Sequence, residues 1–188
     1  MDRRKFLVTS SASVAAMSAP QALRAQGPAP AKLFRWVPHA DLTILDPMFS
    51  TVFITNIHSQ LVFDTLYGLD NQYQPHPQMA IGHVMDPSGL VWKVMLRDDL
   101  KFHDGSPVRA ADAVASLNRW AKKDLMGRSL MEATESLTAL DDKTIEFKLK
   151  KPFPLLLHAI ARPTGSMACV MPEKLAQTPD NVQVKVMN

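Results

Sequence analysis

The stretch "LKFHDGSPVRAADAVASL", Leu100 to Leu117, decides the fold prediction, because it places turn-forming residues directly before a helical pattern. His103 beside Asp104 suggests a hydrolase, whereas Asp104-Gly105 and Pro107 are typical of a tight turn that leads into a helix. Adjacent residues in an extended segment point to opposite sides, so their adjacency is weak support for a hydrogen-bonded His–Asp pair. We interpret the run as architectural, with these positions as its structural signature: Phe102, His103, Asp104, Gly105 and Pro107.

The elements on either side of this run have clear hydrophobic periodicity. "LVWKVML", residues 90–96, alternates between apolar and polar positions and predicts a strand with one buried face. Residues 110–123 predict a helix that packs against the core. Arg119 is expected to face solvent or to lie in the last turn, where the helix dipole favours cations. The apolar stripe of this helix consists of Ala113, Val114, Leu117, Trp120 and Ala121.

The residues before the strand give weaker patterns. Aromatic and branched side chains predict a short strand over 33–38, which Pro38 ends. Apolar residues at helical spacing predict a helix over 56–66, closed by Gly68. Residues 69–89 contain three prolines and are expected to form a loop, with a short turn at 79–82.

The residues after the long helix predict two helical segments separated by a hairpin. Ser129 and Glu132 have the spacing of a capping box, so either a short helix begins there or the segment is a loop. "SLTALDDKTIEFKL", residues 136–149, predicts a hairpin with its turn at 141–143. Residues 153–161 are apolar enough to form a buried helix.

The first 27 residues predict an export signal. They begin with the charged "MDRRK", continue with a mildly apolar stretch over 6–19, and end in the small-x-small cleavage pattern Ala25-Gln26-Gly27. The segment "RRKFL" resembles a twin-arginine signal. A disordered or interfacial N-terminal helix is the alternative. We expect cleavage near Gly27 and a periplasmic mature protein.

Composition argues against several classes of partner. The chain has 21 basic and 18 acidic residues. The export segment holds four of the basic residues and one of the acidic ones, so 17 of each sign remain in the rest. This balance does not favour a nucleic acid partner. The single cysteine, Cys169, excludes an internal disulfide, and no later stretch reaches the roughly 18 apolar residues of a membrane helix.

Known catalytic and metal-binding patterns are not found in the sequence. The nearest candidate for a nucleophile elbow, Thr164 to Ala168, lacks the second glycine. The seven glycines are scattered singly, so no phosphate loop or dinucleotide fingerprint is present. The six histidines form no i, i+4 pair and have no cysteine partners at zinc spacing. We expect no enzyme activity, no cofactor and no metal site.

The motif "LRDDLKFHDGSPVRAADAVASL" resembles the corresponding segment of the family 5 extracellular solute-binding proteins, the dipeptide, oligopeptide and nickel receptors of ABC importers. The resemblance covers about residues 33–175 and includes five further segments: "LDP", "VFDTLYGLD", "LVWKVMLR", "LDDKTIEFKLKKPFPLLLHAIA" and "VMPEKL". In that family, the Phe-His-Asp-Gly run is a structural signature of the first lobe.

The resemblance implies a mixed α/β chain that forms the N-terminal lobe of a two-lobed, periplasmic-binding-protein type II-like fold. It divides the chain into a signal peptide at 1–27, the start of the first lobe at 28–68, an extra subdomain at 69–165, and the beginning of a return into the first lobe at 166–188. The ligand would be a peptide or similar small solute, captured between lobes. The receptor would act as a monomer and dock on an inner-membrane ABC permease.

The family's first-lobe ligand contacts map to the loop after "LDP". The resemblance therefore makes Ser50, Thr51, Val52 and Phe53 the candidate ligand-binding residues, with backbone amides and a hydroxyl that hold a carboxylate or amide. The alternative is that this loop is only a helix N-terminus, capped by Thr51 or Thr55.

Family members are much longer than this chain, and we expect a truncated receptor that lacks the second lobe and binds its ligand weakly or not at all. Two other functions stay open. One is a secreted enzyme that uses His103 and Asp104, and the other is a non-functional remnant of a binding protein, which would fail to fold cooperatively.

Overall fold

The computed structural model describes residues 35–185. The chain divides into two units, residues 1–37 and 38–188, and of the first only 35–37 are described, without regular structure. The predicted export signal lies outside the described residues. The strand expected over 33–38 lies partly outside them as well, and residues 35–38 do not form a strand.

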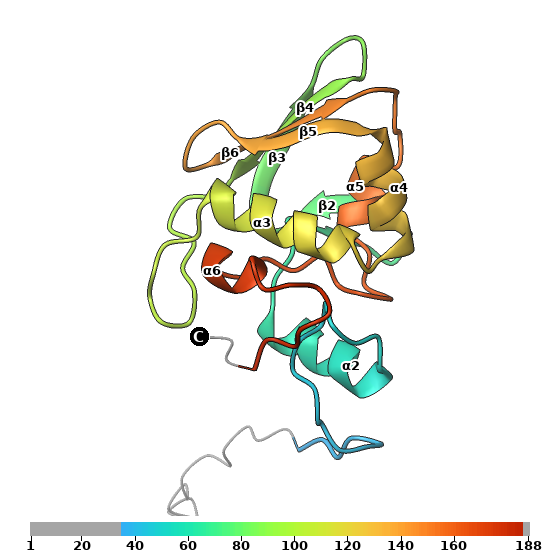
Figure 1. The fold of residues 1–188 in the computed structure, drawn as a ribbon, viewed down its shortest axis with the longest axis vertical. Coiled ribbons are helices and arrows are strands. Elements are labelled where there is room, and N and C mark those ends of the chain that lie inside the picture. Colours follow the sequence, from blue (N-terminus) through green and yellow to red (C-terminus); the bar gives the residue numbers. More distant parts are fainter. Residues whose placement is uncertain (1–34, 186–188) are drawn as a thin grey trace, which may run out of the picture. The chain divides into compact units, whose positions relative to one another are not determined.

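Two antiparallel sheets form the β structure (Figure 1). The larger has the strand order β3-β4-β6-β5, and its centre pairs Trp92 with Phe147 and Val94 with Ile145. Directly opposed residues share one face of an antiparallel sheet, so these four side chains make a single apolar face. The strands are β1 (Tyr67–Leu69), β2 (Pro75–Pro77), β3 (Ala80–Met85), β4 (Val91–Leu96), β5 (Thr134–Ala139) and β6 (Thr144–Leu149).

Helix α3 is the central helix, and it packs against β5, β6, α4 and α6 (Figure 1). Its first turn is joined to that of α6 by Asp112, whose carboxylate accepts hydrogen bonds from the backbone N–H groups of Arg109 and Glu173, each at 2.7 Å. The helices are α2 (Phe53–Val62), α3 (Ala110–Ala121), α4 (Leu125–Ala133), α5 (Leu156–Ile160) and α6 (Glu173–Ala176).

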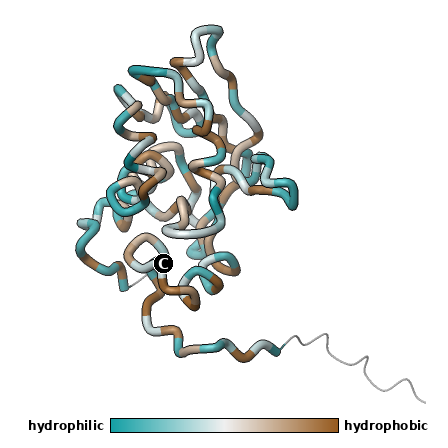
Figure 2. Tube along the Cα trace, turned by 90° about the vertical axis from the view of Figure 1, so that its right-hand side faces the viewer, coloured by the Kyte–Doolittle hydropathy of each residue, from teal (hydrophilic) through white to brown (hydrophobic). Residues whose placement is uncertain are grey.

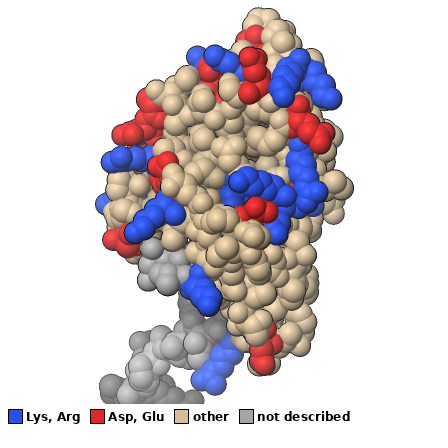
Figure 3. Space-filling model, viewed as in Figure 1, with Lys and Arg blue, Asp and Glu red and all other residues tan. Residues whose placement is uncertain are grey.

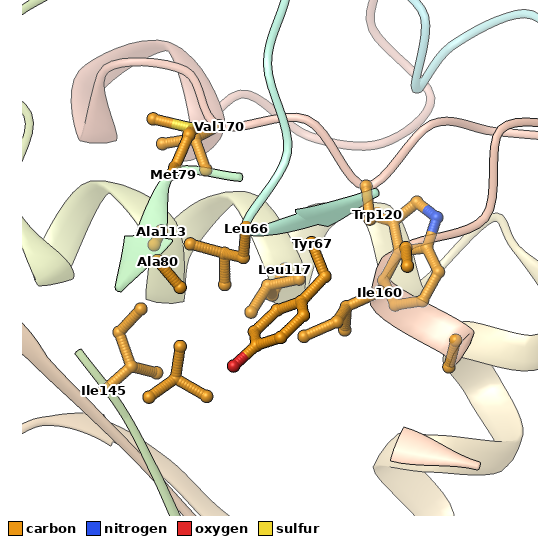
Figure 4. Packing of buried hydrophobic residues seen from close by; sticks show 14 of the residues in the cluster. Leu66, Tyr67, Met79, Ala80, Ala113, Leu117, Trp120, Ile145, Ile160 and Val170 are labelled. Atoms are coloured by element: carbon orange, nitrogen blue, oxygen red, sulfur yellow. The ribbon is translucent and has the colours of Figure 1, made fainter. Parts of the chain in front are cut away.

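One cluster of buried side chains includes residues from 48 to 176 and holds the elements together (Figure 4). The side chains of Trp120, Phe147 and Leu156 are fully buried. Burial of a side chain of this size contributes about 1.5–3 kcal/mol, so the cluster is the main source of stability. Segments that are far apart in sequence therefore depend on one another.

The sequence predicts the middle of the chain correctly. The predicted strand corresponds to β4, whose Trp92, Val94 and Leu96 side chains are buried. The predicted long helix corresponds to α3, and the predicted hairpin corresponds to β5 and β6.

The prediction of a helix over 56–66 is wrong at both ends. Helix α2 begins at Phe53 and ends at Val62. Phe63 has extended backbone angles, which end the helix, and Leu66 lies beyond it, fully buried in the core. Gly68 is not a helix terminator, because it pairs with His76 in the β1–β2 ladder.

The loop predicted over 69–89 is also wrong, because this segment contains β2 and β3. Pro75 and Pro77 lie in β2 of the two-stranded sheet. One edge of β2 has no partner strand in that sheet, so a proline nitrogen at this edge costs the sheet no hydrogen bond. Strand β3 is an edge strand of the larger sheet, and Ile81 and Val84 are exposed there. Exposed apolar residues obscure the alternation by which the sequence would reveal the strand.

The two later helices differ from their predicted bounds. Helix α4 begins at Leu125, because the Asp124 carboxylate accepts from the N–H groups of Met126 and Gly127 and caps the helix. Ser129, the predicted cap, lies inside that helix. The helix expected over 153–161 is limited to α5, since Pro154 disfavours helical backbone angles at the residue before it, Phe153.

Polarity is mixed along the described chain and over the face that Figure 3 shows. Hydrophobic and hydrophilic residues are interleaved along the trace (Figure 2), and none of the described helices meets the length and hydropathy expected of a membrane span. Acidic and basic side chains are interspersed on the face seen in Figure 3.

Candidate functional site

The loop that precedes α2 is shaped by the carboxylate of Asp46. Its Oδ1 atom accepts hydrogen bonds from the backbone N–H groups of Met48, at 3.1 Å, and Phe49, at 3.2 Å. The backbone carbonyl of Asp46 accepts from the N–H groups of Phe49 and Ser50. An Asp side chain that bonds to following backbone amides in this way forms an Asx-turn, so the turn is specified locally by the "LDP" sequence.

The loop then leads to an uncapped helix N-terminus. Ser50 is buried, and its Oγ atom accepts from the N–H group of Val52 at 3.2 Å. Val52 is the N-cap residue, and no side chain makes a cap hydrogen bond. The alternative that Thr51 or Thr55 caps this helix is therefore wrong, and Thr55 instead donates its hydroxyl to the carbonyl of Ile44 at 2.8 Å.

This uncapped terminus offers hydrogen-bond donors and a positive potential. The N–H groups at the first three helical positions have no partner inside a helix, and the first turn of α2 has no acidic residue. The helix dipole adds a partial positive charge at the same end. Donors and a potential of this kind are complementary to a carboxylate or a carbonyl oxygen.

Apolar side chains stand beside these donors. Val52 is 54% exposed and Phe53 is 65% exposed, and the ring of His39 lies 5.3 Å from the ring of Phe53, measured between centroids. Thr51 is exposed, and its carbonyl accepts from the side-chain amide of Asn56 at 3.3 Å. The loop thus combines polar backbone groups with exposed apolar surface.

Behind the loop, Asp46 forms a buried ion pair with Arg119. Nη1 of Arg119 lies 3.0 Å from Oδ1 of Asp46, and Nη2 lies 2.7 Å from Oδ2. The two side chains are 2% and 0% exposed. Arg119 lies in the last turn of α3, which is one of the two expectations for it. The other expectation, that it faces solvent, is wrong, because the arginine has a buried partner 73 residues earlier in the chain.

The C-terminal part of the described chain converges on the same pair. We call residues 178–184 the strap. Arg119 donates to the backbone carbonyls of Thr178 and Val182, each at 3.1 Å, and the N–H group of Val184 donates to Oδ2 of Asp46 at 3.0 Å. One ion pair therefore joins the candidate loop, helix α3 and the strap.

The signature run after β4 has the architecture expected of a turn. Gly105 has a positive φ of 85° and donates to the carbonyl of Phe102, and the strand-like bridge between Lys101 and Pro107 closes the loop. Asp104 accepts from the backbone and the hydroxyl of Ser106, and these hydrogen bonds hold the pKa of its carboxyl below the ordinary value.

No hydrogen bond joins His103 to Asp104 in this part of the described chain. The hydrogen bonds that the Asp104 carboxylate accepts come from Ser106, and both go to its Oδ1 atom. Among residues 35–185, no three His, Cys, Asp or Glu side chains are grouped as a metal site would require. The geometry that a catalytic His–Asp pair needs is not formed in this loop.

Sequence reasoning missed Arg119 and its pairing with Asp46. The available signal was weak: Arg119 directly precedes Trp120 in the core stripe, and Asp46 ends an apolar run. Neither feature identifies a partner at that separation. The sequence also gives no reason to select Asn56 or His39, which border the loop.

A profile of the bacterial extracellular solute-binding proteins, family 5, matches residues 74–183. The chain belongs to this family. The probable peptide ABC transporter periplasmic-binding protein y4tO of Sinorhizobium fredii is 35% identical over 184 residues, which are 98% of this chain and 34% of that protein. The glutathione-binding protein GsiB of Salmonella typhi is 27% identical over 130 residues, which cover 68% of this chain and 25% of that protein.

The fold also matches solved structures of binding proteins. The structure of MoaA from A. tumefaciens R10 in complex with mannopinic acid superposes with a TM-score of 0.62 at 26% identity, and the match covers 71% of this chain and 28% of that one. The described residues thus form a mixed α/β part of the periplasmic-binding-protein type II-like fold. The chain spans about a third of the length of y4tO and a quarter of GsiB.

Proposed function

We propose that this chain supplies first-lobe structure to a periplasmic receptor that captures a peptide or similar small solute and delivers it to an ABC permease. The family membership supports this function, as does the resemblance to a probable peptide-binding protein over nearly the whole chain. The division into a signal peptide at 1–27, lobe segments at 28–68 and 166–188, and a subdomain at 69–165 is part of the proposal, as are export and a monomeric receptor.

Within this proposal, Ser50, Thr51, Val52 and Phe53 contact the solute. The observation that supports this role is the uncapped N-terminus of α2, which has no acidic residue in its first turn and lies beside the exposed Phe53 side chain. Free N–H groups at a helix N-terminus stabilise a carboxylate, and the neighbouring apolar surface removes an apolar group from water.

The receptor is not an enzyme in this proposal, because its role is reversible capture. The relatives and the family are solute-binding proteins. The Asp104 carboxylate is hydrogen-bonded within its own turn, which supports the architectural role of the signature.

Replacing Val52 tests the carboxylate site, because an acidic cap and an anionic solute compete for the same N–H groups. V52D should stabilise α2 by about 1 kcal/mol, since Asp is a favourable N-cap and its charge suits the helix dipole. The same substitution should weaken binding of carboxylate-bearing solutes by tenfold or more. V52N caps the helix without charge and is the matched control.

Binding is measured by calorimetry on the purified receptor with both lobes present, using three probes: a mixed tripeptide pool, glutathione and mannopinic acid. F53A should weaken whichever probe binds, whereas L61A, at a second exposed apolar position of α2, should not. Equal affinity of wild type and V52D would exclude a carboxylate contact at this helix. A wild-type protein that binds none of the probes would contradict the proposed solute class.

A further inference from the structure

We propose that Arg119 is a positioning residue for the candidate binding loop, and that its ion pair with Asp46 couples the loop to the strap, residues 178–184. The ligand-binding role of the loop at Ser50–Phe53 rests on the proposed function. The coupling itself rests only on the buried contacts between the three segments.

One carboxylate serves both segments. Oδ1 of Asp46 accepts from the N–H groups of Met48 and Phe49, which set the path of the loop toward Ser50. Oδ2 of the same side chain accepts from the N–H group of Val184 in the strap. Any rotation of this carboxylate changes the hydrogen bonds of both segments together.

Arg119 fixes the orientation of that carboxylate. Its planar guanidinium pairs with both oxygens, at 3.0 and 2.7 Å, a bidentate geometry that a single ammonium group cannot reproduce. The two remaining contacts of Arg119 go to the strap carbonyls of Thr178 and Val182. The guanidinium therefore lies between the strap and the loop, in contact with the strap and with the residue that shapes the loop.

Because the ion pair is buried, a change in the loop or in the strap alters the hydrogen bonds of Asp46. The Asp46 side chain is fully buried, so a carboxylate that loses its guanidinium partner is left as an unpaired buried charge and must move toward water. That movement weakens the acceptor for Met48 and Phe49. Because coupling free energies are reciprocal, a change in the strap must affect the loop as much as a change in the loop affects the strap.

Amide hydrogen exchange, followed residue by residue by NMR on the purified protein, tests the coupling without any ligand. V184P removes the N–H donor to Asp46 in the strap and touches neither Met48 nor Phe49. We expect exchange at these two amides to become about tenfold faster, as the loss of a charge-assisted hydrogen bond implies. The amide of Phe147 in β6 reports global opening and should keep its wild-type rate.

Two further variants complete the test. Q183P introduces proline one residue earlier, at an N–H group with no hydrogen bond in the described residues, and should leave Met48 and Phe49 unchanged. R119K retains the charge but loses the bidentate fork, and should accelerate exchange at Met48, Phe49 and Val184 together. If V184P unfolds the protein, R119K decides the question.

The coupling would be overturned if the amides of Met48 and Phe49 exchanged at the wild-type rate in both V184P and R119K. An equal acceleration at Phe147 in R119K would also overturn it, because the ion pair would then contribute only global stability. Failure of the proposed function is distinguishable, since it would appear as absence of solute binding in the wild type with the exchange coupling intact.

Discussion

At the scale of single residues, Cys169 shows how complete burial removes reactivity. Its side chain is fully buried, and burial, with a smaller effect of the nearby Asp46 carboxylate, raises the pKa of the thiol. The thiolate is the reactive form, so a buried thiol with a raised pKa reacts only when the chain opens.

We expect Ellman's reagent at mild alkaline pH to leave native Cys169 unlabelled and to label it in urea, along the same transition as circular dichroism. A variant with an exposed thiol, C169A combined with S129C, should react at once under native conditions. Rapid labelling of the native wild type would contradict the burial of Cys169.

Tyr67 predicts how stability responds to alkaline pH. Its ring is buried, and burial raises the pKa of the phenol from 10.0 to about 12. The hydroxyl lies 2.9 Å from Nδ1 of His83. A group whose pKa is raised in the folded state contributes stability below its unfolded pKa and loses it as the pH rises toward its folded pKa.

Stability from Tyr67 should therefore be complete below about pH 10 and decline between about pH 10 and pH 12. In Y67F no phenol ionises at this position, so its urea midpoint should fall less steeply across this window than that of the wild type. The two proteins share all their other ionisable groups, so the effects of those groups cancel in the comparison. Parallel curves would show that Tyr67 ionises as readily in the folded state as in the unfolded chain.

At the scale of elements, Gly127 in α4 is held by a close approach between helices. A Cβ atom at this position would lie 2.7 Å from Cα of Ala121 and 3.1 Å from the ring of Trp120. Helix propensity alone favours alanine over glycine by about 1 kcal/mol. The contact with the backbone of α3 opposes that preference, because both partners belong to the fixed core.

We expect G127A to destabilise the protein by about 1–3 kcal/mol, the usual cost of overpacking. S129A changes an exposed position of the same helix and should shift stability by less than about 0.5 kcal/mol. Urea unfolding followed by circular dichroism measures both. A stabilised G127A variant would mean that α3 and α4 can separate without cost.

The same elements explain what could be predicted from sequence. Strand β4 and helix α3 each bury one face, so the spacing of Trp92 and Val94, or of Leu117 and Trp120, reports their structure directly. Strand β3 lies at the edge of its sheet and exposes the apolar side chains of Ile81 and Val84, so its sequence lacks the alternation that a strand with one buried face shows. The loop at Ser50–Phe53 was selected by resemblance, while its uncapped helix end depends on tertiary contacts.

At the scale of the whole molecule, the Asp46–Arg119 pair is the junction on which distant segments meet. It links residue 46, residue 119 and the strap at 178–184. The residues of the apolar cluster, 48 to 176, all lie in sequence between Asp46 and the strap. Buried ion pairs are costly to form but more costly to break, because a single remaining charge is left without a partner.

R119M should therefore destabilise the protein by about 3–5 kcal/mol, since it leaves the Asp46 carboxylate buried and unpaired. The double variant D46N/R119M should be less destabilised than R119M alone, because a neutral amide at position 46 needs no counterion. K122M, which removes an exposed cation from the end of the same helix, is the control and should change stability by less than about 0.5 kcal/mol. Urea unfolding of wild type, R119M, D46N and D46N/R119M completes a double-mutant cycle and gives the coupling energy, with K122M measured beside them. If R119M and the double variant were equally unstable, the charge of Asp46 would not be what Arg119 neutralises, and the junction would depend on the arginine's bonds to the strap carbonyls alone.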